Sequence, residues 1–382
     1  MRLKLLIIIA WLSLIIFSCN RGSKTIHKEI FYIGTYSVRS SEGIYVYEFN
    51  RDSMKMNLIQ TVDHLKNPSY LTLAPNGKFL YAANGETVND SMNFGSISAY
   101  AVDASTGKLT HINDKSSYGR DPCHIQIDHG GKSLFISNYN NGRLVFYNLK
   151  ADGSISDNYR IFQDTGKSVN PARQESAHVH STLVSPNDKY VYVDDLGLDK
   201  IMIFRYDSSS ASMDPGDPPY VATLPGAGPR HMALHPNLPY LYLIQELSNN
   251  VSVFSLQNEA APVMIQTLSA LPEHYDSVND AADIHVLPSG NFVYSSNRGQ
   301  NTIAIFKVDP ATGRITRTGE HSCGGNWPRA FLVDPEGQFL FVANERSDNL
   351  ALLKVNGETG ELSETGVSVK IPSPVCVKRL EL

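Results

Sequence analysis

The sequence has few cysteines and no excess of positive charge. Its 382 residues contain 4 cysteines, and 33 Lys and Arg residues stand against 38 Asp and Glu residues. This balance argues against a nucleic-acid partner, because a surface that binds nucleic acid usually carries a positive patch. The cysteines show no spacing typical of a zinc finger or a disulfide framework. Gly-rich phosphate loops, the Gly-x-Ser-x-Gly elbow and dinucleotide fingerprints are also missing, so serine nucleophiles and nucleotide cofactors have no support.

The rest of the composition is typical of a globular protein built from short strands. Hydrophobic residues make up 42% of the chain and charged residues 19%, which excludes a disordered or collagen-like protein. The 19 tyrosines, 27 glycines and 20 prolines favour short strands joined by many turns over long helices.

Residues 1–19 resemble a bacterial lipoprotein signal peptide. Arg2 and Lys4 precede an apolar run that extends to Phe17 and is short for a membrane span. The run ends in Ile16–Cys19 (IFSC), which resembles a lipobox, although Phe17 is bulky for that motif. We therefore expect lipidation of Cys19, a short tether over residues 20–29, and a membrane-anchored protein that faces the periplasm or the cell exterior. The alternatives are an uncleaved anchor or an ordinary signal peptide, and a protein without a signal would be cytoplasmic.

Six segments of the chain repeat one pattern. Each has an apolar strand, a tight turn with Pro or Gly, and a second strand of aromatic and aliphatic residues that ends in a polar residue. The turns lie about 52 residues apart, which leaves room for four strands per repeat, as in the blades of a β-propeller. The turn residues are Pro75, His129, Pro186, Pro236, Pro288 and Pro335.

The two ends of the chain supply a seventh repeat. Phe31–Gly34 matches the second strand of the pattern, and Pro374–Arg379 matches the first strand. Pairing these segments closes the ring and leaves no exposed edge. We therefore predict an all-β fold, a seven-bladed β-propeller formed as one domain over residues 30–382. The Ser- and Pro-rich stretch Ser208–Pro219 is predicted to be a loop inside a blade.

The repeats bring charged side chains to one end of the central channel. Antiparallel pairing places the start of each first strand and the end of each second strand at the same face. Counted from the turn residue, position −6 carries His180, Arg230 and Arg329, and position +10 carries Glu246 and Arg298. Position +9 always carries an amide or a carboxylate, which we interpret as a structural cap of the next turn. Those residues are Asn84, Asn138, Asp195, Gln245, Asn297 and Asn344.

This set combines groups that bind anions with groups that transfer protons. Arginines present planar forks to carboxylate or phosphate, and a histidine beside a glutamate can exchange a proton near neutral pH. The alternative is that these charges only neutralise one another at a polar channel mouth. His178 and His180 could be two metal ligands, but spacing places no third ligand, so no metal site is predicted. Further candidate lining residues for substrate binding are His178, His124, His231, His285 and Asp283.

Four motifs resemble the propeller lactonase family. They are Gly226–Met232, Gln245–Leu247, Ala282–His285 and Pro328–Phe331, and the resemblance extends from about Ile30 to the C-terminus. The family contains bacterial 6-phosphogluconolactonases of the propeller type and fungal carboxy-muconate lactonizing enzymes. The family's active-site His resembles His180, its two arginines resemble Arg230 and Arg298, and its acid resembles Glu246.

The resemblance implies hydrolysis of a sugar δ-lactone without a metal or organic cofactor. Glu246 or His180 would activate water, and Arg230 and Arg298 would hold an anionic substrate and the developing oxyanion. The signal-like residues 1–19 put the identity of the substrate in question, because a 6-phosphogluconolactonase serves the cytoplasmic pentose phosphate pathway. An unphosphorylated lactone is therefore an alternative substrate. A lactone-forming cycloisomerase and a non-enzymatic binding propeller stay open as well. As partner we expect a small anionic lactone, with no nucleic acid, and we expect a monomer.

Overall fold

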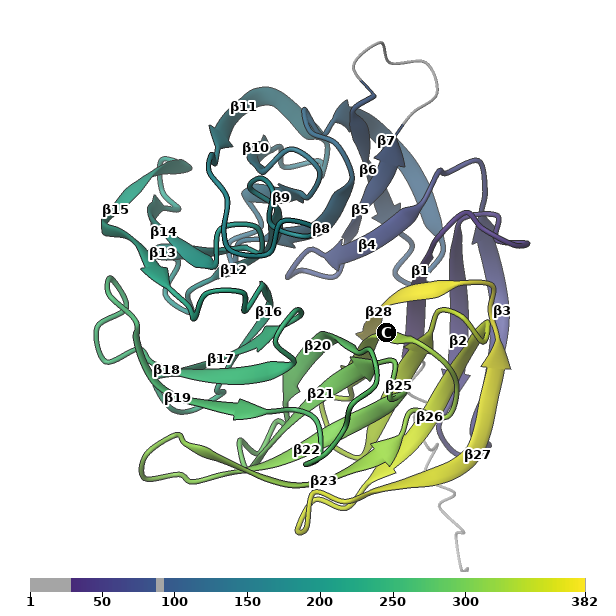
Figure 1. The fold of residues 1–382 in the computed structure, drawn as a ribbon. Coiled ribbons are helices and arrows are strands. Elements are labelled where there is room, and N and C mark those ends of the chain that lie inside the picture. The colour runs from purple at the N-terminus through teal and green to yellow at the C-terminus, as the bar shows by residue number, and fades with distance from the viewer. Residues whose placement is uncertain (1–28, 87–92, 382) are drawn as a thin grey trace, which may run out of the picture.

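The computed structural model describes residues 29–86 and 93–381, which form seven four-stranded antiparallel sheets arranged in a ring (Figure 1). The predicted all-β, seven-bladed propeller is therefore confirmed. Residues 1–28, with Cys19 and most of the expected tether, lie outside the described residues. In the described ranges, no helix is long and apolar enough to cross a membrane.

Six of the blades use four consecutive strands each. The first three blades are formed by β4 (Pro68–Leu73), β5 (Phe79–Glu86), β6 (Gly95–Val102) and β7 (Leu109–Ser116), then β8 (Pro122–Ile127), β9 (Ser133–Asn138), β10 (Arg143–Leu149) and β11 (Ile155–Gln163), then β12 (Val179–Val184), β13 (Tyr190–Asp195), β14 (Lys200–Asp207) and β15 (Ser212–Ala222). The next three are formed by β16 (Pro229–Leu234), β17 (Tyr240–Gln245), β18 (Asn250–Ser255) and β19 (Val263–Ser269), then β20 (Asp280–Val286), β21 (Phe292–Arg298), β22 (Thr302–Val308) and β23 (Ile315–Ser322), then β24 (Pro328–Val333), β25 (Phe339–Asn344), β26 (Asn349–Val355) and β27 (Leu362–Lys370).

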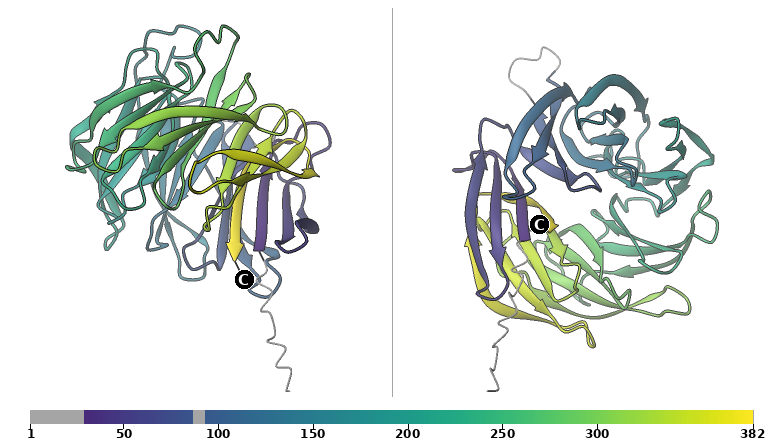
Figure 2. Two further views of the ribbon diagram at one scale, coloured as in Figure 1. Left: turned by 90° about the horizontal axis from the view of Figure 1, so that it is seen from below. Right: turned by 180° about the vertical axis from the view of Figure 1, so that it is seen from behind.

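The seventh blade joins the two ends of the chain. It contains β28 (Pro374–Glu381), β1 (Glu29–Thr35), β2 (Ile44–Asn50) and β3 (Lys55–Val62), in that order. β1 and β28 are antiparallel, with Phe31 opposite Arg379, as predicted from the sequence, and they lie side by side in Figures 1 and 2. The buried carboxylate of Glu29 reinforces this closure, because it binds Arg379 at 2.7 Å and Arg51 at 2.6 Å.

Tyrosines in the second strands tie neighbouring blades together. The hydroxyl of Tyr81 donates to the carbonyl of Gly153 at 3.0 Å, and that of Tyr242 donates to Gly313 at 3.0 Å. Tyr32, Tyr192 and Tyr294 make equivalent bonds to a turn of the following blade. Each tyrosine therefore buries its ring in the apolar layer between two blades while its hydroxyl keeps a hydrogen-bond partner. This explains why the second strand of the repeat carries an aromatic residue at this position.

The polar residues at position +9 are buried in every repeat. The side-chain amides of Asn138, Asn297 and Asn344 donate to carbonyls of the segment that arrives from the preceding blade, at 3.3, 3.1 and 3.0 Å. Asp195 instead accepts from the backbone of Leu198 at 3.0 Å, which is the expected turn cap. The position is structural, as predicted, but three of its amides connect blades.

Part of the Ser208–Pro219 segment differs from the prediction. It lies inside a blade, but only its first residues form a turn, and from Ser212 onwards the chain runs in β15. β15 is the outer strand of its sheet, and its register shifts between Met202 and Phe204 of β14. An edge strand tolerates proline because it needs no hydrogen bonds on its outer side.

Candidate active site

A β-bulge near the start of the first strand aims side chains into the channel. In β12, the residues on either side of His180 pair with consecutive residues of β13, so His180 is the extra residue. Arg230 in β16 and Arg329 in β24 are extra in the same way, as are Ser69 and Cys123. A bulge interrupts the alternation of side chains and re-aims one of them. The repeated bulge therefore delivers position −6 of several blades to the same end of the channel.

The centre of this end is a buried carboxylate surrounded by three guanidiniums. Glu246 directly follows β17, and its Oε2 lies 2.7 Å from Nε of Arg230 and 2.9 Å from Nη2 of Arg298. Its Oε1 lies 2.5 Å from Nη2 of Arg173. Arg230 also donates to the carbonyl of Ala282 in the next blade. Glu246 thus fixes arginines that come from two blades and one long loop.

Burial and charge decide the protonation states here. Burial acts to raise the pKa of Glu246, but the charges of Arg298, Arg230 and Arg173 outweigh it and hold that pKa well below its ordinary value. Burial and the charge of Arg298 lower the pKa of Arg230 to about 10, so it remains a cation at neutral pH. Burial and the charge of Arg230 keep the pKa of His180 well below its ordinary value. At pH 7 the site therefore holds charged arginines, an ionised Glu246 and a neutral His180.

Except for Arg230, these groups line a cavity of about 420 Å³. Two arginines at its wall make cation–π contacts with aromatic rings. The guanidinium of Arg329 lies 5.0 Å from the ring centre of Tyr36, and that of Arg298 lies 5.7 Å from Trp327. The remaining lining residues are Asp121, Cys123, Tyr139, Arg173, His180, Glu246, Asp280, Glu345 and Arg346. The size suits one small ligand, and the polar lining suits one rich in oxygen.

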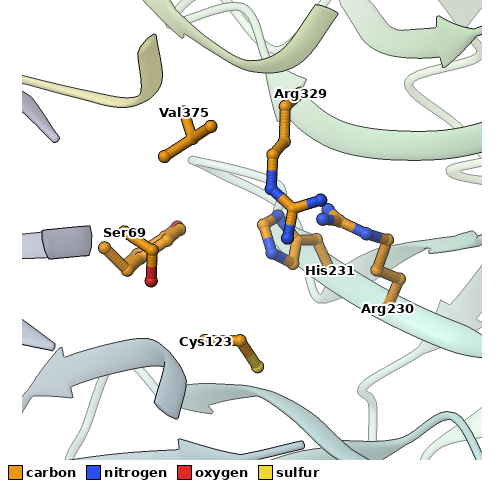
Figure 3. A pocket seen from close by; sticks show the side chains of 7 residues that line it. Ser69, Cys123, Arg230, His231, Arg329 and Val375 are labelled. Atoms are coloured by element: carbon orange, nitrogen blue, oxygen red, sulfur yellow. The ribbon is translucent and has the colours of Figure 1, made fainter. Parts of the chain in front are cut away.

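Deeper in the channel the walls close to a narrow void. It has a volume of about 10 Å³, and Figure 3 shows the guanidiniums of Arg230 and Arg329 beside the ring of His231 at its wall. Beyond it lies a second cavity of about 260 Å³, lined by His124, His231, Asp283 and His285 among others. His231 lines both spaces.

Comparison with known proteins identifies the family. The chain matches the family described as lactonase, 7-bladed beta-propeller, over residues 30–379. It belongs to the seven-bladed propeller lactonase family. Among its relatives are the 6-phosphogluconolactonases of Bacillus subtilis strain 168 (34% identical, covering 92% of this chain and 99% of that protein) and of Formosa agariphila (36% identical, 79% and 86%). The solved structure of the periplasmic gluconolactonase PpgL of Pseudomonas aeruginosa is 32% identical, with a TM-score of 0.86 and coverage of 92% of this chain and 99% of that one. The resemblance seen in the sequence motifs is confirmed.

In this propeller lactonase, the structure gathers His180, Arg230, Glu246, Arg298 and Arg329 at one channel mouth. Four other candidates from the sequence lie at the second cavity instead, and these are His124, His231, Asp283 and His285.

His178 does not belong to the lining of either cavity. Its ring stacks on Tyr139, with ring centres 4.5 Å apart, and its Nε2 lies 3.2 Å from Glu175. Together with the bulge at His180, this position separates the two histidines that the sequence placed on one strand face. Among the described residues, no cluster of His, Cys, Asp and Glu has an arrangement suited to a metal ion.

Sequence reasoning missed Arg173, Tyr36, Trp327 and Arg346. Arg173 lies in the connection between β11 and β12, which is longer than the corresponding connection between any other two blades. Nothing in the repeat pattern could have marked it.

Proposed function

We propose that this protein hydrolyses a sugar δ-lactone, with 6-phospho-D-glucono-1,5-lactone as the first candidate substrate. The observation that carries the proposal is the buried Glu246 that holds three arginines beside a neutral His180 in a cavity of small-ligand size. The names of the Bacillus and Formosa relatives support the substrate class.

The arginines supply what lactone opening needs. Attack on the lactone carbonyl places negative charge on its oxygen, and fixed guanidiniums stabilise that charge without reorganising. Arg298 and Arg329 line the cavity, and Glu246 holds Arg298 at 2.9 Å, so a substrate meets an arginine already in place. Both carboxylate oxygens of Glu246 are already bound by guanidiniums, and the charges of those arginines hold its pKa well below its ordinary value, so Glu246 has no free lone pair directed at a water molecule. We assign it the role of positioning the arginines.

His180 faces the same cavity as a neutral ring. Its Nδ1 is buried and has no hydrogen-bond partner within the protein. A neutral imidazole can donate from one nitrogen and accept at the other, so His180 can orient the hydroxyl groups or the ring oxygen of a sugar lactone. Its ring lies edge-on to Tyr139, with centres 5.7 Å apart, which fixes its direction.

Unphosphorylated D-glucono-1,5-lactone is the second candidate. Four arginines line the cavity, but so do the four acidic residues Asp121, Glu246, Asp280 and Glu345. Carboxylates at the wall accept hydrogen bonds from sugar hydroxyls and oppose a phosphate dianion. The name of the Pseudomonas structure and the signal-like residues 1–19 favour the same choice.

The signal-like segment also carries a proposal on location. Its basic start, its apolar run and Cys19 in a lipobox-like setting support a lipid-anchored protein that faces the periplasm or the cell exterior. Such a protein meets sugar lactones formed outside the cytoplasm.

The test is a panel of lactones offered to purified protein. It contains 6-phosphoglucono-1,5-lactone, glucono-1,5-lactone and galactono-1,4-lactone, whose ring opening is measured by the acid released at pH 6, where spontaneous hydrolysis is slow. An open-chain carboxy-muconate is offered separately, and its ring closure is measured by the loss of its ultraviolet absorbance. We expect kcat/KM for one of the two glucono-1,5-lactones to exceed the others clearly. Turnover of carboxy-muconate alone would favour the cycloisomerase, and no turnover of any compound would favour a binding propeller.

A further inference from the structure

A histidine that the site above leaves unused lies at the narrow void between the two cavities. His231 follows Arg230 in β16, is 5% exposed, and has no hydrogen-bond partner at Nε2. An unpaired polar atom in such a place costs free energy, so its retention calls for a functional explanation.

The other nitrogen of this ring is held by a carboxylate. Nδ1 of His231 lies 2.8 Å from Oδ1 of Asp283, in the first strand of the next blade. Asp283 also accepts from Nε2 of His285 at 3.2 Å and from the backbone nitrogen of Phe331 at 3.0 Å. Burial acts to raise the pKa of Asp283, but His285 and His231 hold it well below its ordinary value. The carboxylate is thus ionised, and it fixes the tautomer of His231 with the proton on Nδ1 and the lone pair on Nε2.

The void beside His231 has room for about one water molecule, since its volume is about 10 Å³. The other polar groups at its wall cannot take a proton. Arg230 and Arg329 are cations, Ser69 already donates to a carbonyl at 3.3 Å, and burial raises the pKa of the Cys123 thiol far above neutrality.

Burial raises the pKa of the remaining titratable wall residue, Tyr70, well above its ordinary value, so its phenol stays neutral. Of the seven residues that line this void, His231 alone offers a basic nitrogen.

We propose that His231, oriented by Asp283, is the general base of lactone hydrolysis and takes a proton from a water held in this void. The inference rests on the proposed lactonase function. Arg329 and Cys123 line both the void and the large cavity, so water in the void borders the space where the lactone binds. The adjacent guanidiniums of Arg230 and Arg329 stabilise the hydroxide character that the water gains as it attacks (Figure 3).

The step balances without a further reactant. The water oxygen bonds to the lactone carbonyl carbon while one water proton moves to Nε2 of His231, and the carbonyl electron pair moves onto its oxygen. When the carbonyl re-forms, the ring C–O bond breaks, and the ring oxygen takes the proton from Nε2 and becomes a hydroxyl group. The carboxylic acid then loses its proton to solvent. Asp283 stays ionised throughout and acts as a positioning residue.

The pH dependence follows from the groups around the ring. Burial and then the charge of Arg230 lower the pKa of His231 to about 4, although Asp283 acts to raise it. The other titratable groups that face it are Tyr70, His124, His180, His285, Cys123 and Arg329. Because the base must be unprotonated, kcat is expected to be level from pH 5 to 7 and to fall as pH drops towards 4.

The experiment compares kcat and KM from pH 3.5 to 7 in the full-length wild type, His231→Asn and Asp283→Asn. Asparagine keeps a donor near the position of Nδ1 and removes Nε2. The matched control is His129→Asn, because His129 forms a 2.7 Å pair with Asp188 on the exposed surface. A general base typically contributes 10²–10⁴-fold to the rate, so we expect kcat of His231→Asn to fall by about that factor while KM changes little. The fall of kcat between pH 5 and pH 4 should also disappear in this variant. Asp283→Asn is expected to lower kcat with KM little changed, and the control to match the wild type.

Two results separate failure of this inference from failure of the function. In the first, the wild type turns over a lactone, and His231→Asn keeps the same kcat and the same fall of kcat at low pH. This result overturns the role of His231 and leaves the lactonase function in place. A wild type that is inert on the whole panel refutes the lactonase function and this inference with it. If His231→Asn does not fold, His231→Gln and Asp283→Asn decide by the same criteria, with folding checked by circular dichroism.

Discussion

Replacing Glu246 by glutamine should lower the free energy of unfolding as well as the lactonase activity. The side chains of Arg230 and Arg298 are 2% and 5% exposed, and Glu246 is the carboxylate that neutralises both. Removing one partner of a buried ion pair costs about 3–5 kcal/mol, because the remaining charge stays buried without compensation. With an unfolding entropy of about 2.1 cal/mol/K for each of roughly 350 propeller residues, that loss corresponds to a fall in Tm of about 4–7 °C.

The loss of stability in Glu246→Gln should depend on pH in a defined direction. The pKa of Glu246 is lower in the folded protein than its ordinary value of 4.5, so its ionisation stabilises the fold above about pH 4.5. That contribution is lost as pH falls from about 5 towards the lowered pKa. The difference in stability between wild type and Glu246→Gln is therefore expected to be constant between pH 6 and 8 and to shrink below pH 5.

Differential scanning calorimetry at pH 7 and at pH 4 tests both statements. Glu358→Gln is the control, since Glu358 is exposed and a surface substitution usually changes stability by less than about 0.5 kcal/mol. Inorganic phosphate should partly restore the Tm of Glu246→Gln, because an anion can replace the missing charge among the arginines. A loss below about 1 kcal/mol at pH 7, or a deficit that grows at low pH, would refute the reasoning.

Four further outcomes are expected. Arg298→Ala should lower kcat for both glucono-1,5-lactones, because the developing oxyanion loses a fixed charge, and should also raise KM for the phosphorylated one; steady-state kinetics that show an unchanged kcat would contradict this. Binding of an aldonate should change the fluorescence of Trp327, which lines the cavity with the guanidinium of Arg346 3.2 Å from its ring centre, and a signal that survives in Trp327→Phe would contradict this. Ending the chain after Ser373 removes β28 and reopens the ring, so Tm should fall on the order of 10 °C or more, and an unchanged melting curve would show that closure contributes little. Cys19→Ala should abolish labelling by a fatty-acid probe, and an unlabelled wild type would count against lipidation.

The bulge at the start of the first strands shows where sequence reasoning stops. Counting from the turns placed His180 and Arg230 near Glu246, because turn position and antiparallel pairing fix which ends of two strands meet. The count did not reveal that these residues are the extra ones of a bulge, since a bulge is a local change of register that leaves no mark on the alternation of a six-residue strand. It also could not show that His231, one residue further, reaches the second cavity.

The repeating pattern by itself determined the number of blades, the closure by β1 and β28, and the face on which His180, Arg230, Glu246, Arg298 and Arg329 gather. These features depend on hydrophobic periodicity and turn spacing, which are properties of neighbouring residues along the chain. Only the tertiary structure decided that Arg173 completes the cluster around Glu246, and that the channel narrows at His231. The long loop that carries Arg173 has no periodicity to interpret. The depth of a side chain along the channel is set by how seven blades pack around one axis, which no single repeat encodes.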